Sequence, residues 1–316
     1  MSGFAYAVDA DRIEALSPRA AITRHGELVW VHLTSNNEEA QAWLSGEAGL
    51  HEYIVDALTA VESRPRCGQI EDGAHLNLRG RSTDDMPMSD PLASVRVWAV
   101  QSRVISVTRR PMPAIDTVAR CVRDGRIRDP GDLIAELATA ITEELDPEVA
   151  ELGDALDDCE EQLDAARVFE LRRQVTKVRV TAIGYRRFLS PQRTAIEKLA
   201  GLPVSWLCDD DRLHLSAAAD RAARMTEELE AIRERAALTH EALTDLRAEQ
   251  IDARALVIAI VAMIFLPLTF LTGLLGMNVK GIPYADAPWA FNGVVAVCGV
   301  IAVAITGYFI QRRWFR

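Results

Sequence analysis

The strongest pattern along the chain is a pair of long apolar stretches close to its C-terminus, at residues 255–275 and 289–310. Neither stretch contains a charged residue, and each is close to the ~20 residues that a helix needs to cross the hydrocarbon core of a bilayer. A loop of residues 276–288 joins them. We predict two transmembrane helices in a multi-pass protein that has the lipid bilayer as one of its partners.

The charges that flank the two stretches predict how the protein sits in the membrane. Arg247 and Arg254 precede the first stretch, and a basic tail, residues 311–316, follows the second. The loop carries one Lys280 against one Asp286. Because Lys and Arg in short flanking segments favour the cytoplasmic side, we expect cytoplasmic N- and C-termini and an outward loop. No apolar run near the start resembles a signal peptide, so we predict a location in the cell (inner) membrane.

Residues 1–128 have the pattern of a cytoplasmic α/β domain. Short runs rich in β-branched and aromatic residues are typical of strands, and they are interrupted by two segments with helical periodicity. A turn is expected at residues 84–87. The predicted strands are residues 27–34, 75–79, 94–99 and 103–108, and the predicted helices are residues 37–45 and 51–60.

From there the chain becomes helical. Breaks near residues 165–166 and 201–203 predict a helical hairpin over residues 129–208. Nine acids and no Lys or Arg occur between Asp146 and Asp164. Two interpretations stay open: the basic residues of the next helix pair with this acidic run, or the run gathers divalent cations.

A long stalk helix is predicted over residues 209–254. Its three opening acids suit the positive end of a helix dipole, and no Pro or Gly follows until Pro267. We expect one helix to continue to Leu275, about 100 Å long at 1.5 Å per residue. Such a rod must pack against the hairpin or against copies of itself.

The composition and the motifs of the chain exclude several classes of function. The formal charge of −11 disfavours nucleic acid as a partner, because phosphates demand a basic surface, and favours cations. The five cysteines are scattered singly, without a C-x-x-C pair, which argues against disulfides and a cysteine-rich zinc site. We find no glycine-rich phosphate loop, metalloprotease helix or nucleophile elbow. The sequence therefore predicts no enzyme and no cofactor.

One face of the stalk and the first apolar stretch carries small, weakly polar or acidic residues in steps of three and four. Small residues allow close helix packing in lipid, which is one interpretation; the other is that the stripe lines a pore. Its acids below the membrane would then form a cytoplasmic vestibule that attracts cations. The stripe comprises Gly273, Thr269, Leu266, Ala262, Ala259, Ala255, Asp252, Ala248, Asp245 and Glu241.

The segment from Phe265 to Asn278 resembles the end of the first membrane helix in the CorA superfamily of divalent metal ion transporters, including its Gly-Met-Asn signature. Three other segments are most similar to the ZntB branch, the zinc transporters of that superfamily. They are Glu62-Ser-Arg-Pro-Arg66, Ile105-Ser-Val-Thr-Arg109 and Arg186-Arg-Phe-Leu-Ser-Pro-Gln-Arg193.

This resemblance implies a funnel-shaped homopentamer, with the α/β domain and long stalk helices in the cytoplasm and a central pore lined by the first membrane helix. Gly276, Met277 and Asn278 would form the selective outer mouth, where a ring of amide oxygens holds the waters of a hydrated dication. Thr269 and Gly273 would continue the polar contacts. Leu266 would form a hydrophobic constriction.

The resemblance implies transport of a divalent cation, with zinc expected and nickel, cobalt and cadmium as further ions, and coupling to protons. A magnesium/cobalt channel is the alternative, and a membrane-anchored sensor or scaffold without transport is the second. Lys280 follows the signature where magnesium channels usually place acids. The first span has no Cys or His, the ligands that zinc favours, so we expect Zn²⁺ or Mg²⁺ to pass largely hydrated.

His214 and His240 on the stalk are two further candidates for metal binding. Either imidazole could contact zinc, whereas a lone histidine on a helix is more often a surface or packing residue. Both interpretations stay open from the sequence.

Overall fold

A computed structural model of the chain describes residues 2–10, 12–34, 38–60, 64–83, 92–277, 281–282, 284 and 286–311. The predicted turn at residues 84–87, together with Asn278, Lys280 and the arginines of the tail, lies outside these residues. The chain forms two compact units. The first comprises Met1–Leu163 and Phe169–His240, and the second comprises Asp164–Val168 and Glu241–Arg316.

The first unit contains a seven-stranded sheet in the order β2-β1-β3-β7-β6-β5-β4. Only β3 and β7 pair in parallel, and the other neighbours are antiparallel. The strands are β1 (Gly3–Asp9), β2 (Arg12–Leu16), β3 (Leu28–Leu33), β4 (Arg66–Ile70), β5 (Gly73–Arg81), β6 (Leu92–Val100) and β7 (Arg103–Thr108). The four predicted strands are confirmed as β3, β5, β6 and β7, whereas β1, β2 and β4 were not predicted.

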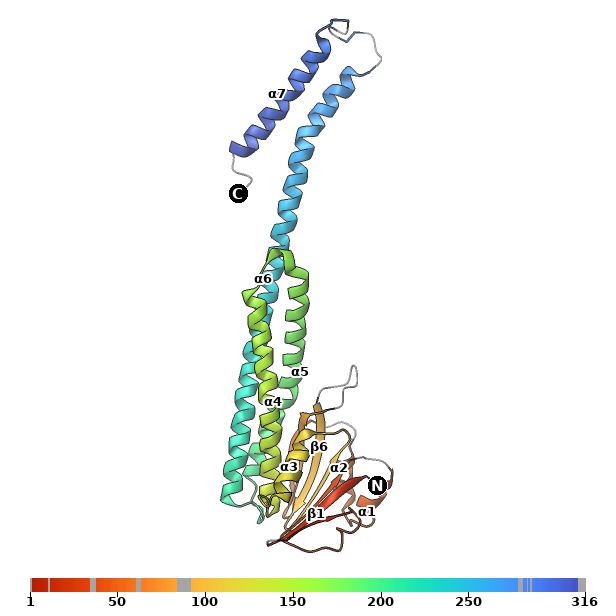
Figure 1. Cartoon of the computed structure of the whole chain (residues 1–316), viewed down its shortest axis with the longest axis vertical. Helices are drawn as coiled ribbons and strands as arrows, with labels where there is room; N and C mark the ends of the chain where they lie inside the picture. The colour runs from red at the N-terminus through yellow and green to blue at the C-terminus, as the bar shows by residue number, and fades with distance from the viewer. Residues whose placement is uncertain are drawn as a thin grey trace. The chain divides into compact units, whose positions relative to one another are not determined.

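Helices cover the sheet on both faces (Figure 1). The predicted helices are confirmed as α1 (Glu38–Ser45) and α2 (Glu52–Thr59), whose apolar side chains share one core with alternate residues of β3. On β5, a side chain at Gly80 would meet Ile141 of the helix α4 (Pro130–Glu161), so that helix packs closely on the sheet. The alternation of side chains along each strand thus supplies two apolar layers.

Three long helices complete the first unit: α4 (Pro130–Glu161), α5 (Val168–Ala200) and the initial part of α6 (Asp209–Leu275), with the shorter α3 (Pro113–Arg123) beside the sheet. Figure 1 shows α4, α5 and α6 side by side. A buried row on α6 faces the hairpin, as expected for a rod that needs a packing partner. It comprises Leu215, Ala218, Ala222, Met225, Leu229, Ile232 and Ala236.

Among the described residues, the acidic run on α4 forms ion pairs with elements other than the expected helix α5. Arg235 of α6 contacts both Asp157 and Glu160, and Arg81 of β5 lies 3.2 Å from Glu148. Arg186 of α5, which we expected opposite the acidic run, instead pairs with Glu230 of α6 at 2.7 Å. The predicted hairpin of α4 and α5 forms. Arg235 of α6, however, pairs with two of the acids on α4.

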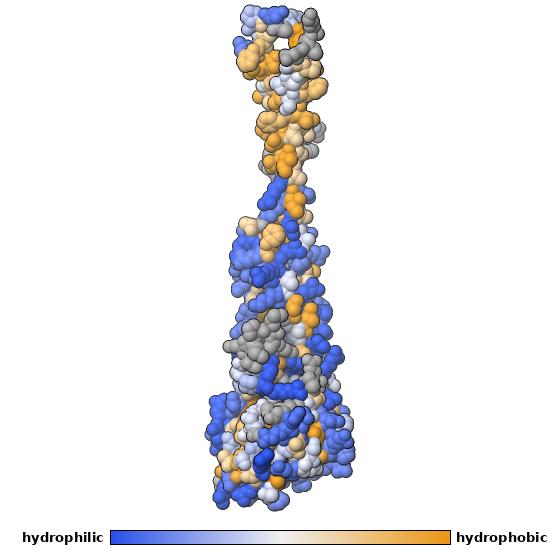
Figure 2. Space-filling view, turned by 90° about the vertical axis from the view of Figure 1, so that its right-hand side faces the viewer, coloured by the Kyte–Doolittle hydropathy of each residue, from blue (hydrophilic) through white to orange (hydrophobic). Residues whose placement is uncertain are grey.

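The second unit holds the C-terminal part of α6 and the helix α7 (Ala290–Gln311). Both helices are long and apolar enough to cross a membrane. Only 6% of the most apolar 18-residue segment of each helix is buried. Hydrophobic side chains dominate their visible surface in Figure 2. α6 continues through Pro267 to Leu275 as one helix of 67 residues. All five cysteines are free, as the sequence predicted.

Candidate ion pathway along the first apolar helix

Every residue of the predicted stripe lies on α6 and is exposed in the single chain. Helical spacing explains why they share one face, since steps of three and four residues return close to the same direction at 100° per residue. The exposed set contains carboxylates at its N-terminal end, then alanines, then Leu266, Thr269 and Gly273 toward the loop.

The opposite face of α6 packs toward α7. Ile260 is buried, and Leu271 and Leu275 border a groove of about 280 Å³ together with Gly293 and Val297 of α7. At 100° per residue, this face lies about half a turn away from the stripe. The second apolar helix therefore leaves the stripe uncovered.

The upper part of the stripe can offer oxygen atoms to hydrated ions. Thr269 Oγ1 donates to the carbonyl of Phe265 at 2.8 Å, which leaves its lone pairs available to water. Apart from its own turn of the helix, no atom of the described residues lies within 4 Å of the place where a Cβ at Gly273 would be, so the backbone is open there. Pro267 lacks an N–H and frees the carbonyl of Met263, which lipid cannot satisfy. These hydrogen-bond acceptors suit water more than hydrocarbon.

The predicted outer mouth begins where α6 ends. Gly276 and Met277 follow Leu275 directly and are exposed. The Gly276 N–H donates to the carbonyl of Thr272 at 2.9 Å, which continues the helical pattern to that residue. Asn278 and Lys280 fall outside the described residues, so their roles stay predictions.

Below the apolar segment, Asp252, Asp245 and Glu241 are exposed along the same helix. They belong to the second unit together with the apolar helices. Three carboxylates along one side of a helix attract cations through their summed negative charge.

The two stalk histidines, His214 and His240, lie far apart along α6. They are 26 positions apart on α6, about 39 Å at 1.5 Å per residue, so one ion cannot contact both. His240 Nε2 lies 3.3 Å from a guanidinium nitrogen of Arg172, and His214 Nε2 lies 3.6 Å from a carboxylate oxygen of Asp210. Each imidazole therefore has a protein neighbour at that nitrogen.

A cluster of three carboxylates was not predicted. Oxygen atoms of Asp129, Asp132 and Asp211 lie within 4.8 Å of one another. All three accept backbone N–H groups at helix starts: Asp129 from Asp132 at 2.9 Å, Asp132 from Arg128 at 3.0 Å, and Asp211 from Cys208 at 2.9 Å. Burial raises the pKa of Asp132 and Asp211. Helix capping accounts for this geometry. The sequence marks Asp211 only as one of the three acids that open the stalk helix.

The seven-stranded sheet, the 67-residue helix and two apolar C-terminal helices define an integral membrane protein with a large α/β and helical unit before its spans. Residues 25–313 match the family model described as CorA-like Mg²⁺ transporter protein. The chain belongs to this family of divalent cation transporters, which confirms the resemblance and agrees with the expectation that it is no enzyme.

Relatives in this family carry different names. The chain is 34% identical over 293 residues to the divalent cation transporter CmaX of Pseudomonas aeruginosa, covering 91% of this chain and 88% of that protein. It is 29% identical over 286 residues to the zinc transport protein ZntB of Pectobacterium carotovorum subsp. carotovorum, covering 90% and 87%.

Solved structures share the fold over almost the whole chain. The structure of full-length CmaX is 31% identical, with a TM-score of 0.78, covering 99% of this chain and 98% of that one. The CorA magnesium transporter from Methanocaldococcus jannaschii has a TM-score of 0.82 at 17% identity, with the same coverage. At that identity, the second likeness concerns the fold alone.

Proposed function

We propose that this protein is a homopentameric transporter in which five copies of α6 surround a pore for divalent cations. The observation that carries the proposal is the stripe from Asp252 to Gly273, which is exposed and lies on the face of α6 away from α7. A monomer would expose that stripe to lipid, where its hydroxyl and backbone groups are poorly satisfied. Around a shared axis they would face water.

Zinc is the ion that we propose, with nickel, cobalt and cadmium as further ions. The ZntB relatives support zinc, whereas the description of the family supports the magnesium/cobalt alternative. Neither the first apolar stretch nor the Gly-Met-Asn signature contains Cys or His, so the available ligands are oxygen atoms and the weakly binding thioether sulfurs of Met263 and Met277. Such ligands suit an ion that keeps most of its water.

This proposal assigns a location and a role to each segment of the chain. Residues 1–128, 129–208 and 209–254 would stand in the cytoplasm, together with both termini, and the loop 276–288 would face outward at the inner membrane. Repeated five times, Asp252, Asp245 and Glu241 would form the vestibule. Asn278 would form the mouth, where neutral amide oxygens select a dication without retaining it.

Reconstitution into vesicles tests the proposal. With a zinc-sensitive dye inside, we expect wild-type protein to admit Zn²⁺ and Asn278→Ala to reduce or abolish entry. Asn292→Ala is the matched control, because it removes an exposed asparagine from the start of α7 and not from the mouth. Equal transport by Asn278→Ala and the wild type would contradict the role of Asn278.

Parallel assays separate the alternatives. Faster entry of Mg²⁺ than of Zn²⁺ would favour the magnesium/cobalt channel, and vesicles with folded protein that admit neither ion would favour a sensor or scaffold. A proton gradient tests coupling. Because the two apolar stretches contain no Asp, Glu, Lys, Arg or His, any proton relay must lie outside them.

A further inference from the structure

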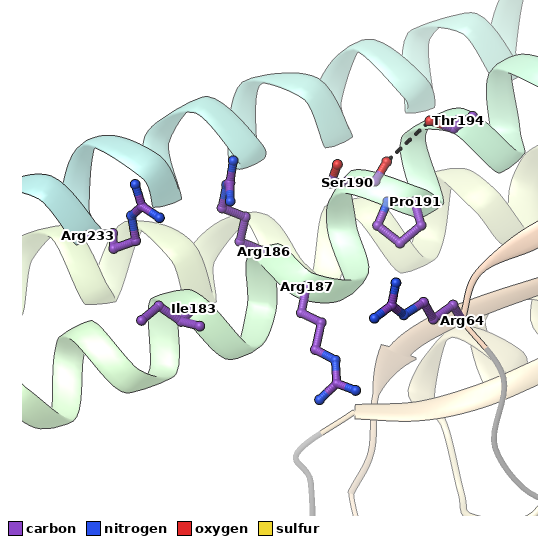
Figure 3. A pocket seen from close by; sticks show the side chains of 8 residues that line it. All are labelled: Arg64, Ile183, Arg186, Arg187, Ser190, Pro191, Thr194 and Arg233. Carbon is purple, nitrogen blue, oxygen red and sulfur yellow. Dashed lines mark hydrogen bonds between the residues drawn. The ribbon is translucent and has the colours of Figure 1, made fainter.

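A second concave site lies in the first unit, far along the sequence from the ion pathway. A pocket of about 510 Å³ opens between α5, α6 and the residues that precede β4 (Figure 3). Four arginines line it: Arg64, Arg186, Arg187 and Arg233. Among the residues that the structure describes, none that lines this pocket is acidic. Ser190 and Thr194 add two hydroxyl groups on α5.

Tertiary packing brings this set together. Arg64 and Arg187 come from two segments more than 100 residues apart, Glu62–Arg66 and Arg186–Arg193, that the ion pathway leaves unexplained. The buried Gln192 accepts the backbone N–H of Arg79 at 2.7 Å and so fixes α5 to the edge of β5 beyond the end of β4. The carbonyl of Arg64 accepts from Asn77 of β5 at 2.9 Å.

The pocket carries an excess of positive charge. Arg186 and Arg233 share Glu230: Arg186 Nε lies 2.7 Å from one of its oxygens, and Arg233 contacts the other. Within the described part of the chain, Arg64 and Arg187 form no ion pair with an acid. Figure 3 shows Arg64 extending toward α5 and Arg187 extending from α5 toward the sheet.

A phosphate chain fits this arrangement best. Guanidinium groups present a planar fork of N–H donors that matches phosphate oxygens, and such charge-assisted hydrogen bonds are about twice as strong as neutral ones. The volume exceeds that of a single phosphate group, and the arginines approach from three separate parts of the fold. We propose that the pocket binds a soluble phosphate chain, either inorganic pyrophosphate or the triphosphate of a nucleotide.

Isothermal titration of the full-length protein in detergent tests this proposal. Pyrophosphate and ATP are titrated separately, in buffer with EDTA so that divalent cations do not sequester them. Binding of both with similar affinity would identify the phosphate chain as the recognised group, and tighter binding of ATP would add a contribution from the nucleoside. Both results support the pocket. Absence of measurable binding for both would overturn it.

Variants locate the binding. We expect Arg64→Gln with Arg187→Gln to weaken binding at least about tenfold, which corresponds to the loss of one good charge-assisted contact. Arg173→Gln with Arg179→Gln removes the same charge from exposed positions of α5 outside the pocket and should leave affinity unchanged. Equal weakening by both pairs would show a diffuse charge effect and refute the site.

A second pair of variants, which keeps the positive charge, separates a loss of binding from a loss of folding. Arg64→Lys with Arg187→Lys keeps the charge and removes the fork, so we expect affinity between those of the wild type and the Gln pair. Circular dichroism verifies that each variant is folded. Lysine variants that bind as weakly as the Gln pair would also support fork recognition, whereas wild-type affinity in the Gln pair would exclude these arginines.

Discussion

At the scale of single residues, the least expected group is a histidine inside the sheet. His32 of β3 is 1% exposed, and its Nδ1 lies 2.8 Å from Ser106 Oγ on the parallel neighbour β7. Thr108 Oγ1 lies 3.3 Å from the other ring nitrogen. Burial lowers the pKa of His32 to about 3. A charged imidazole there would lose its hydration, so the ring stays neutral.

This shift predicts how stability depends on pH. Between pH 7 and pH 5, His32 gains a proton in the unfolded chain, where its pKa is 6.5, but stays neutral in the folded one. Stability therefore falls as the pH falls, by about 2 kcal/mol from this residue. Urea titrations of the wild type and His32→Gln at both pH values measure it. We expect a smaller decrease in the variant; an equal decrease would show that His32 is not the source.

At the scale of elements, the first turns of α4 and α6 approach each other so closely that no side chain fits between them. A Cβ at Gly131, in the first turn of α4, would lie 2.0 Å from an oxygen of Asp211 in the first turn of α6 and 3.0 Å from the carbonyl of Trp206. Only the absence of a side chain lets α4 approach this capping carboxylate.

Gly131→Ala should destabilise the first unit by roughly 1–3 kcal/mol, because the added methyl group displaces Asp211 from its hydrogen bond. Gly184→Ala is the matched control. It lies inside α5 with no atom within 4 Å of the new methyl, so we expect a gain of roughly 0.5–1 kcal/mol from helix propensity. Thermal unfolding followed by circular dichroism distinguishes the two signs. Similar effects at both glycines would contradict the contact.

At the scale of the whole molecule, the exposed face of the first apolar helix determines the expected assembly. Native mass spectrometry should give about 175 kDa, five times the 34.9 kDa of one chain. Mild oxidation of Ala262→Cys should link neighbouring copies, because this stripe position faces the shared axis in our proposal. Val303→Cys, on the exposed surface of α7, should not link. A monomeric mass, or links at Val303 alone, would contradict the pentamer.

The strands and the site residues that could be predicted from the sequence were those marked by a local pattern of apolar runs or helical spacing. The strands β3, β5, β6 and β7 are rich in buried apolar residues and were visible as runs, whereas the edge strands β2 and β4 are short and contain one buried residue between them, Cys67. For the site, helical spacing alone placed Thr269 and Gly273 on one face. No spacing rule could indicate that this face avoids α7.

The sequence by itself determined the two apolar helices, the uninterrupted α6 and the stripe along it, because length, hydropathy and helical spacing act over neighbouring residues. Only the tertiary structure decided that Arg235 compensates the acids of α4, that Asp211 meets Gly131, and that Arg64 joins the arginines of α5. These contacts join residues far apart in the chain, so their partners emerge only when the sheet and the helices pack.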